Sequence, residues 1–147
     1  MKRFQILFLL CLALSFTFSI FAQDTKEVII LQTSDVHSRI EPINQKGDRY
    51  YNKGGFVRRA AFLEQFRKDH KNVLLFDCGD ISQGTPYYNM FRGEVEIKLM
   101  NEMSYDAMTI GNHEFDFDVD NMARIFKMAD FPVVCANYNL DATVLKD

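Results

Sequence analysis

Four short apolar runs along the chain alternate with longer segments in which apolar and polar residues mix. The runs cover residues 28–31, 73–76, 106–110 and 132–136. Short apolar runs bounded by turn residues are typical of β-strands. The first run contains no polar residue, whereas a half-exposed strand would alternate, so we predict a strand buried on both faces.

Between these runs, apolar residues return every three or four positions, which is the spacing that lines one face of a helix. Gly54 and Gly55 are expected to start the first helix rather than to bind phosphate, and Asp118 is expected to cap the third. The order β-α-β-α-β-α-β indicates an α/β fold with an at least partly parallel sheet. The predicted inner faces consist of Phe56, Ala60, Leu63 and Phe66, then Val95, Leu99, Met100 and Met103, then Val119, Met122, Ala123 and Phe126.

Each of the first three predicted strands is followed directly by side chains that bind metals or move protons. Asp-Val-His occupies residues 35–37, Asp-Cys-Gly-Asp residues 77–80, and Gly-Asn-His-Glu-Phe-Asp residues 111–116. In parallel sheets the loops past the carboxyl ends of the strands carry the chemistry. We therefore expect these three loops to form one site.

The first two loops offer donors for divalent metals. Asp35 and His37 are two residues apart, so in an extended backbone both side chains point to the same side and can bind one cation. The two carboxylate oxygens of Asp80 can bridge two cations, whereas Asp77 is expected to accept hydrogen bonds from loop amides. Each motif taken alone also fits an ordinary turn beside a surface histidine, so the spacing by itself leaves both interpretations open.

The third loop is the most specific string in the sequence. Gly111 allows a sharp turn, the amide oxygen of Asn112 is an acceptable metal ligand, and His113 would point elsewhere and be free for proton transfer. Asp116, three residues further on, can orient the imidazole, which fixes its tautomer and raises its basicity. The loop therefore predicts a histidine–aspartate pair beside a metal ligand.

The composition fits one globular domain. The 147 residues are 48% hydrophobic and 25% charged, without the charge excess of a disordered chain. The 17 basic residues stand against 20 acidic ones, which gives a net charge of −3. A basic patch for nucleic acid is therefore not expected, and we predict no nucleic-acid partner.

Residues 1–22 are predicted to be a secretory signal peptide. Residues 1–3 form a positive start, and residues 4–22 carry no charge and end in a small residue. An uncleaved membrane anchor is the alternative, because the run is about as long as a short spanning helix. Three hydroxyl residues interrupt its second half and no basic cluster follows, so we favour cleavage, no remaining membrane span, and export to the periplasm, the cell surface or the medium.

Cleavage leaves two cysteines, Cys78 and Cys135. An oxidising compartment would allow a disulfide between them. Both residues end predicted buried strands, which favours two buried thiols instead. The sequence contains no C-x-x-C motif, so a cysteine zinc cluster and a thioredoxin-type redox pair are excluded.

Taken together, the Asp-x-His motif, Gly79-Asp80 followed by Gln-Gly-Thr at residues 83–85, and the string at 111–116 resemble the calcineurin-like metallophosphoesterases. The most similar branch is the exported 5′-nucleotidase/UDP-sugar hydrolase/2′,3′-cyclic phosphodiesterase family. The resemblance covers about residues 26 to 140. It implies a four-layer α-β-β-α sandwich, of which residues 23–147 would be the N-terminal part, the first half in the order βαβαβαβ.

The resemblance also implies a role for each residue of the site. His113, oriented by Asp116, would stabilise the transition state and protonate the leaving oxygen. The substrate would be a nucleotide or another phosphoester, and a metal-bound hydroxide would attack phosphorus in line. The cofactors would be two divalent metal ions, with zinc, manganese and iron better suited than calcium to mixed nitrogen and oxygen ligands. The implied metal ligands are Asp35 and His37 for the first ion, Asp80 as the bridge, and Asn112 for the second.

The sequence departs from the family pattern in its later ligands. The family supplies further histidines from later segments, but this chain has only three histidines and none follows His113. We therefore expect the catalytic domain to be incomplete at the C-terminus, and the isolated chain to fold marginally and hydrolyse little.

Two alternatives to a complete enzyme stay open. The chain would be a truncated, non-catalytic exported metal-binding fragment, or one half that needs a second chain to supply the missing C-terminal half. A generic secreted α/β binding module would require Asp35→Ala and Asn112→Ala to leave metal uptake unchanged.

Overall fold

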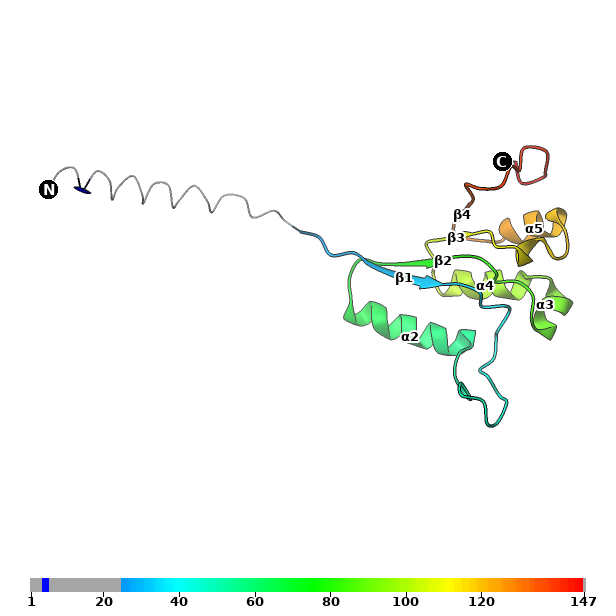
Figure 1. The fold of residues 1–147 in the computed structure, drawn as a ribbon, viewed down its shortest axis with the longest axis horizontal. Helices are drawn as coiled ribbons and strands as arrows, with labels where there is room; N and C mark the ends of the chain where they lie inside the picture. The colour runs from blue at the N-terminus through cyan, green and yellow to red at the C-terminus, as the bar shows by residue number, and fades with distance from the viewer. Residues whose placement is uncertain (1–3, 6–24, 147) are drawn as a thin grey trace.

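The computed structural model describes residues 4–5 and 25–146. All but two residues of the predicted signal peptide, residues 1–22, therefore lie outside the described residues. Four parallel strands lie side by side in chain order, β1-β2-β3-β4 (Figure 1). They are β1 (Ile29–Thr33), β2 (Val73–Asp77), β3 (Ala107–Thr109) and β4 (Val133–Val134).

The helices connect these strands. Gly55 is the N-cap residue of the first long helix, as predicted from the sequence. The side chain of Asp118 caps the last helix by accepting a hydrogen bond from the backbone N–H of Asn121 at 2.6 Å, which confirms the predicted cap. The helices are α2 (Phe56–Asp69), α3 (Pro86–Phe91), α4 (Glu94–Glu102), the short 3₁₀ helix η1 (His113–Phe115) and α5 (Val119–Phe126).

The hydrophobic core lies on one face of the sheet. The strand order follows the chain order, so right-handed crossovers carry every connecting helix over the same face. The register aligns Leu31 with Leu75 and Met108 with Val133 on that face. Leu75 and Met108 are each only 1% exposed and pack into the core cluster with side chains of the helices. The predicted α/β fold with a parallel sheet is therefore confirmed.

The opposite face of the sheet is much more open, and here one prediction is wrong. The first apolar run is not buried on both faces: β1 alternates between half-buried and exposed residues, and Ile30 is 63% exposed. The same face carries the half-buried Leu74 and Phe76 and, on β4, Val134, which is 54% exposed. The physical reason is that, within residues 25–146, all the connecting helices cover the other face.

Four further details differ from the sequence prediction. The inner face of α4 centres on Ile97 and Met100 and includes the fully buried Glu96, whereas Val95 and Leu99 are only half-buried. Ala60 of α2 is exposed although the helical spacing placed it inside. The helices α3 and η1 were not predicted at all, and β4 is shorter than the predicted strand over residues 132–136.

The two cysteines of the described residues are both free thiols. Cys78 is exposed and Cys135 is half-buried, so the expected burial is wrong for Cys78. Cys78 directly follows the last residue of β2 and falls on the open face of the sheet together with Phe76. None of the helices in the described part of the chain is long and apolar enough to cross a membrane.

Candidate metal centre

The loops that follow β1 and β2 remain paired beyond the ends of the strands. The backbone N–H of Asp35 donates to the carbonyl of Gly79 at 3.0 Å, and that of His37 donates to the carbonyl of Asp80 at 3.0 Å. These hydrogen bonds continue the parallel ladder into the loops. Asp35 and His37 of the first loop therefore lie beside Asp80 of the second.

The backbone of these loops is not extended. The φ angles of Asp35, His37 and Asp80 are 52°, 45° and 56°, in the left-handed region that non-glycine residues rarely adopt. The assumption of an extended Asp-x-His segment is therefore wrong. The two side chains approach one another nevertheless, since His37 Nε2 lies 4.0 Å from Asp35 Oδ1. Clusters of such strained residues are typical of functional sites.

Two glycines bring the β2 loop against the β3 loop. A Cβ atom on Gly79 would lie 2.5 Å from the backbone nitrogen of Gly111. A Cβ atom on Gly111 would lie 2.5 Å from the backbone nitrogen of Asp80. Only glycine allows this close approach, which places the residues after Gly111 next to Asp80.

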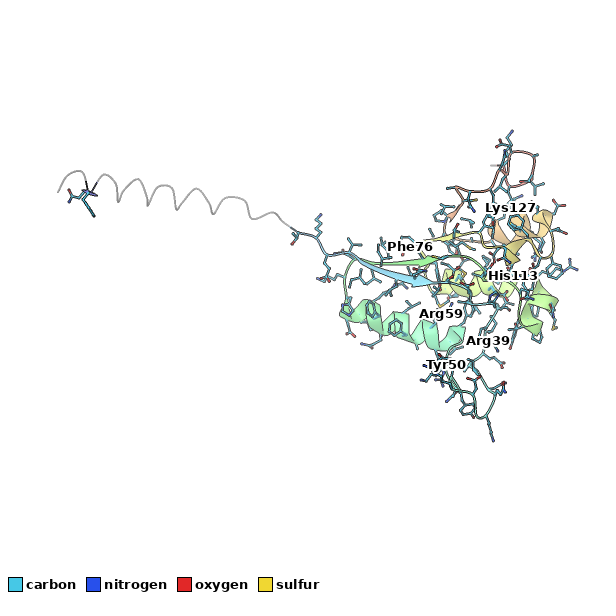
Figure 2. The ribbon with its side chains drawn as sticks, in the orientation of Figure 1. Arg39, Tyr50, Arg59, Phe76, His113 and Lys127 are labelled. Carbon is cyan, nitrogen blue, oxygen red and sulfur yellow. The ribbon has the colours of Figure 1, made fainter. Side chains whose placement is uncertain are left out.

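His37, Asp80 and His113 form a cluster at the carboxyl end of the sheet. Each offers one ligand atom, and these three atoms all lie within 4.8 Å of one another. The rings of His37 and His113 meet edge to face with their centroids 5.0 Å apart. Figure 2 shows His113 beyond the carboxyl ends of the strands. All three side chains are half-buried, which leaves them accessible to a ligand from solvent.

The two other predicted metal ligands lie at the rim of this cluster. The side chain of Asp35 is 65% exposed and reaches the cluster through His37. Asn112 is exposed and lies between Gly111 and His113, whose backbone N–H donates to Asp80 Oδ1 at 2.9 Å. The structure thus places all four predicted ligands at one edge of the sheet.

The third loop also forms the predicted histidine–aspartate pair. His113 Nδ1 lies 2.8 Å from Asp116 Oδ2. This hydrogen bond, together with the negative charges of Asp116 and Asp80, raises the pKa of His113 above its ordinary value. The interaction of Nδ1 with Asp116 leaves Nε2 as the nitrogen available for a ligand or a substrate.

Glu114 holds the second and third loops together, and sequence reasoning missed it. Its side chain is 1% exposed, and Oε2 accepts the backbone N–H groups of Asp80 at 2.9 Å and Gly111 at 2.7 Å. Oε1 accepts the backbone N–H of Ser82 at 3.2 Å. The sequence contains one signal for this role: Glu114 is an acid inside the string at 111–116 that is needed neither as a metal ligand nor to orient His113.

Asp77 has the structural role that the sequence suggested. Its Oδ1 accepts the backbone N–H of Gly79 at 2.8 Å, and its Oδ2 accepts the hydroxyl of Thr33 at 2.6 Å. The side chain is buried, and this burial raises its pKa from 3.8 to about 6. Asp77 therefore supports the turn that carries Asp80.

The donor set of this cluster fits a divalent transition metal. Two imidazole nitrogens and a carboxylate oxygen converge, and the carboxylate of Asp35 lies 4.0 Å from His37. Such mixed nitrogen and oxygen donors suit zinc, manganese or iron better than calcium, which prefers oxygen ligands alone.

Comparisons with known proteins agree with this geometry. The snake venom 5′-nucleotidase of Crotalus adamanteus is 41% identical over 115 residues, which cover 76% of this chain and 20% of that protein. The crystal structure of the 5′-nucleotidase precursor from Thermus thermophilus has a TM-score of 0.67 at 37% identity and covers 75% of this chain and 22% of its own. The structure of the NAD nucleotidase of Haemophilus influenzae has a TM-score of 0.72 at 32% identity, and the match covers 82% of this chain and 22% of that one.

These matches define the extent of the likeness. The chain spans about a fifth of the length of the curated relatives it matches. Its sheet and helices correspond to the N-terminal half of the metallophosphatase fold. Residues 28–144 match the calcineurin-like phosphoesterase family, and this chain therefore belongs to that family.

Proposed function

We propose that the chain is the N-terminal part of a metal-dependent phosphoester hydrolase of the 5′-nucleotidase kind, with nucleotides as substrates. The observation that carries the proposal is the convergence of His37, Asp80 and His113 within 4.8 Å at the carboxyl end of the sheet. The similarity to relatives named 5′-nucleotidase and NAD nucleotidase supports the choice of substrate.

In this proposal the chain's own residues hold two divalent cations. Asp35 and His37 would hold the first, Asn112 would hold the second, and Asp80 would be shared between them. When bound, such cations activate water and neutralise the charge on a transferring phosphoryl group. The hydrogen bond from the N–H of His113 to Asp80 Oδ1 fixes the orientation of the bridging carboxylate.

His113 supplies the proton for the leaving oxygen. Asp116 accepts the hydrogen bond from Nδ1, so a protonated His113 presents its second proton at Nε2 toward the cluster. The hydrogen bond to Asp116 raises the pKa of His113, which favours the protonated form. Asp116 therefore acts as a positioning residue that sets both the tautomer and the charge of the imidazole.

A second function is favoured by a specific observation. The same three ligand atoms that lie within 4.8 Å can hold a single cation, with His113 as a direct ligand. His113 would then have no proton to donate, and the chain would bind metal without hydrolysing phosphoesters, alone or as one half that needs a second chain.

Titration of the purified chain with Mn²⁺ by calorimetry, combined with phosphate release from AMP, distinguishes the two functions. Two cations per chain, with release that is lost in Asp80→Ala and Asn112→Ala, supports the hydrolase. One cation without release, whose binding is lost in His113→Ala, supports the metal-binding function. Absence of binding would overturn both. Asp48→Ala, in the loop before α2, is the control, because its carboxylate accepts a hydrogen bond from the backbone N–H of Tyr50 in the same loop.

We also propose that residues 23–147 reach an exported location, in the periplasm, at the cell surface or in the medium, after removal of residues 1–22. The uncharged run at residues 4–22 supports this, as do a relative from snake venom and one named a precursor. N-terminal sequencing of the secreted or periplasmic protein tests it, and a first residue of Met1 would contradict cleavage.

A further inference from the structure

Glu96 is a fully buried acid on the inner face of α4, outside the metal cluster. Its exposed fraction is 0%, and its Oε2 atom has no hydrogen-bond partner. Among the described residues, no lysine, arginine or histidine forms an ion pair with it. An ionised carboxylate in this position would have no positive charge beside it, and an unpaired charge is costly in a protein interior.

A chain of hydrogen bonds connects Glu96 to the loop that carries His37. Ser38 Oγ is hydrogen-bonded to Glu96 Oε1 and lies 2.7 Å from Thr85 Oγ1. The hydroxyl of Thr85 donates in turn to the backbone carbonyl of Ser38 at 2.9 Å. These three contacts join α4 to the loops after β1 and β2.

The number of protons available to these hydrogen bonds bears on the protonation state of Glu96. If each of the three contacts has a proton of its own, the two hydroxyl groups of Ser38 and Thr85 supply two of the three. The carbonyl of Ser38 supplies none. A carboxylic acid at Glu96 supplies the third by donating to Ser38 Oγ, whereas with an ionised Glu96 the hydroxyl of Ser38 would donate to it and that of Thr85 would be shared between two oxygens of Ser38. Full burial without an ion pair favours the acid. Burial, which raises the pKa of Glu96, acts in the same direction.

The chain of hydrogen bonds acts on the backbone next to the cluster. Ser38 directly follows His37, and its N–H donates to the carbonyl of Ile81 at 2.8 Å. Ser38 has a φ of 53° and His37 one of 45°, and such conformations persist only where their surroundings hold them. On the other side, a Cβ atom on Gly84 would lie 2.8 Å from the carbonyl oxygen of His37, so the two loops are in close contact.

We propose that Glu96 is a neutral carboxylic acid that donates its proton to Ser38 and thereby holds His37 in position beside Asp80. Glu96 is a positioning residue, because it touches neither the cluster nor a substrate. The inference rests on the proposed metal site for its functional consequence, whereas the protonation and the loop contact do not depend on a metal.

Three variants of the full chain test this role. Glu96→Gln keeps a donor at the same place, Glu96→Met keeps the volume without a donor, and Glu102→Met is the matched control on the exposed side of α4. We expect Mn²⁺ to bind Glu96→Gln within about twofold of the wild type. Binding to Glu96→Met should weaken by about tenfold or more, as is typical when a group that orients a ligand is removed. Glu102→Met should bind like the wild type.

Two readouts without metal keep this inference separate from the proposed function. In ¹³C-glutamate-labelled protein at pH 7, infrared spectroscopy should show a protonated carboxyl band that disappears in Glu96→Gln. Hydrogen exchange should show the Ser38 amide protected in the wild type and Glu96→Gln but not in Glu96→Met, with the Leu75 amide unchanged. If the wild type binds no Mn²⁺, the proposed function fails while these readouts still decide the role of Glu96.

The inference is overturned if the carboxyl band is absent, if Glu96→Met keeps the Ser38 amide protected, or if Glu96→Gln behaves like Glu96→Met. Should Glu96→Met fail to fold, Thr85→Val replaces it, because it removes one hydroxyl of the same chain of hydrogen bonds. In Thr85→Val the Ser38 amide should then lose the protection from hydrogen exchange that it has in the wild type.

Discussion

Glu114 offers the sharpest quantitative test of how the candidate site is built. Its two carboxylate oxygens accept three backbone N–H groups, two at Oε2 and one at Oε1. In Glu114→Gln the amide oxygen can take the place of Oε2 and keep the bonds from Asp80 and Gly111. The amide NH₂ then faces the N–H of Ser82, which leaves one buried donor unsatisfied at a cost of about 2 kcal/mol.

Glu114→Ala removes all three acceptors. The cost per unsatisfied donor is about 1–3 kcal/mol, but relaxation and water entry reduce the sum, so we expect a loss of about 4 kcal/mol. For a domain of this size, a loss of 1 kcal/mol lowers Tm by about 4 °C, so the expected shifts are about 8 °C for Gln and about 16 °C for Ala.

Urea unfolding of the metal-free protein, followed by circular dichroism, measures both losses, and a thermal scan checks the shifts in Tm. Glu102→Gln, on the exposed side of α4, should change the unfolding free energy by less than about 0.5 kcal/mol. A Glu114→Gln variant as stable as the wild type, or a Glu114→Ala variant that loses less than about 1 kcal/mol, would refute the assignment of three charge-assisted bonds to this residue.

Three further predictions concern the same loops. Burial raises the pKa of Asp77 from 3.8 to about 6, so the folded state holds the proton more tightly. The contribution of Asp77 to stability should therefore be greatest below pH 3.8 and fall by about 3 kcal/mol as pH rises through 6. In metal-free urea titrations Asp77→Asn should remove this decline, and an unchanged decline would contradict the assignment. Asp116→Asn should lower the pKa of His113 in an NMR titration in which His70 does not move; an unmoved His113 would rule out the pair. Gly111→Ala should destabilise the chain by about 2 kcal/mol or more, because its Cβ would meet the backbone of Asp80. Gly47→Ala, which meets no atom within 4 Å, should lose only the smaller cost of backbone strain, and equal losses would exclude a steric role for Gly111.

The order of the strands and of the three longer helices, α2, α4 and α5, could be predicted because it depends on local patterns. Apolar runs, helical spacing and the capping residues Gly55 and Asp118 are all properties of short segments. The placement of chemistry after each of the first three strands could be predicted for a similar reason, since the carboxyl ends of parallel strands share one edge. The contact between His37, Asp80 and His113 follows from that topology.

The burial of individual residues could not be predicted, because it depends on the layers that surround them. A continuous apolar run such as residues 28–31 shows that a strand is compatible with burial on both faces, but not that a second layer is present. Ile30 is exposed because the helices cover only the other face. The conformation of Asp35 and His37 was missed because left-handed φ angles leave no periodic pattern in the sequence.

Glu96 and Glu114 show why a buried glutamate gives no indication of its charge in the sequence. Glu114 faces three backbone N–H donors, so both of its oxygens act as acceptors. Glu96 faces the hydroxyl of Ser38 in a fully buried position where its second oxygen has no partner, which favours a neutral acid. The same substitution therefore has opposite consequences at the two positions: glutamine replaces a donor at position 96 and removes an acceptor at position 114. The surroundings of each carboxyl group, which only the fold assembles, thus determine what its side chain contributes to the loops that carry the candidate metal ligands.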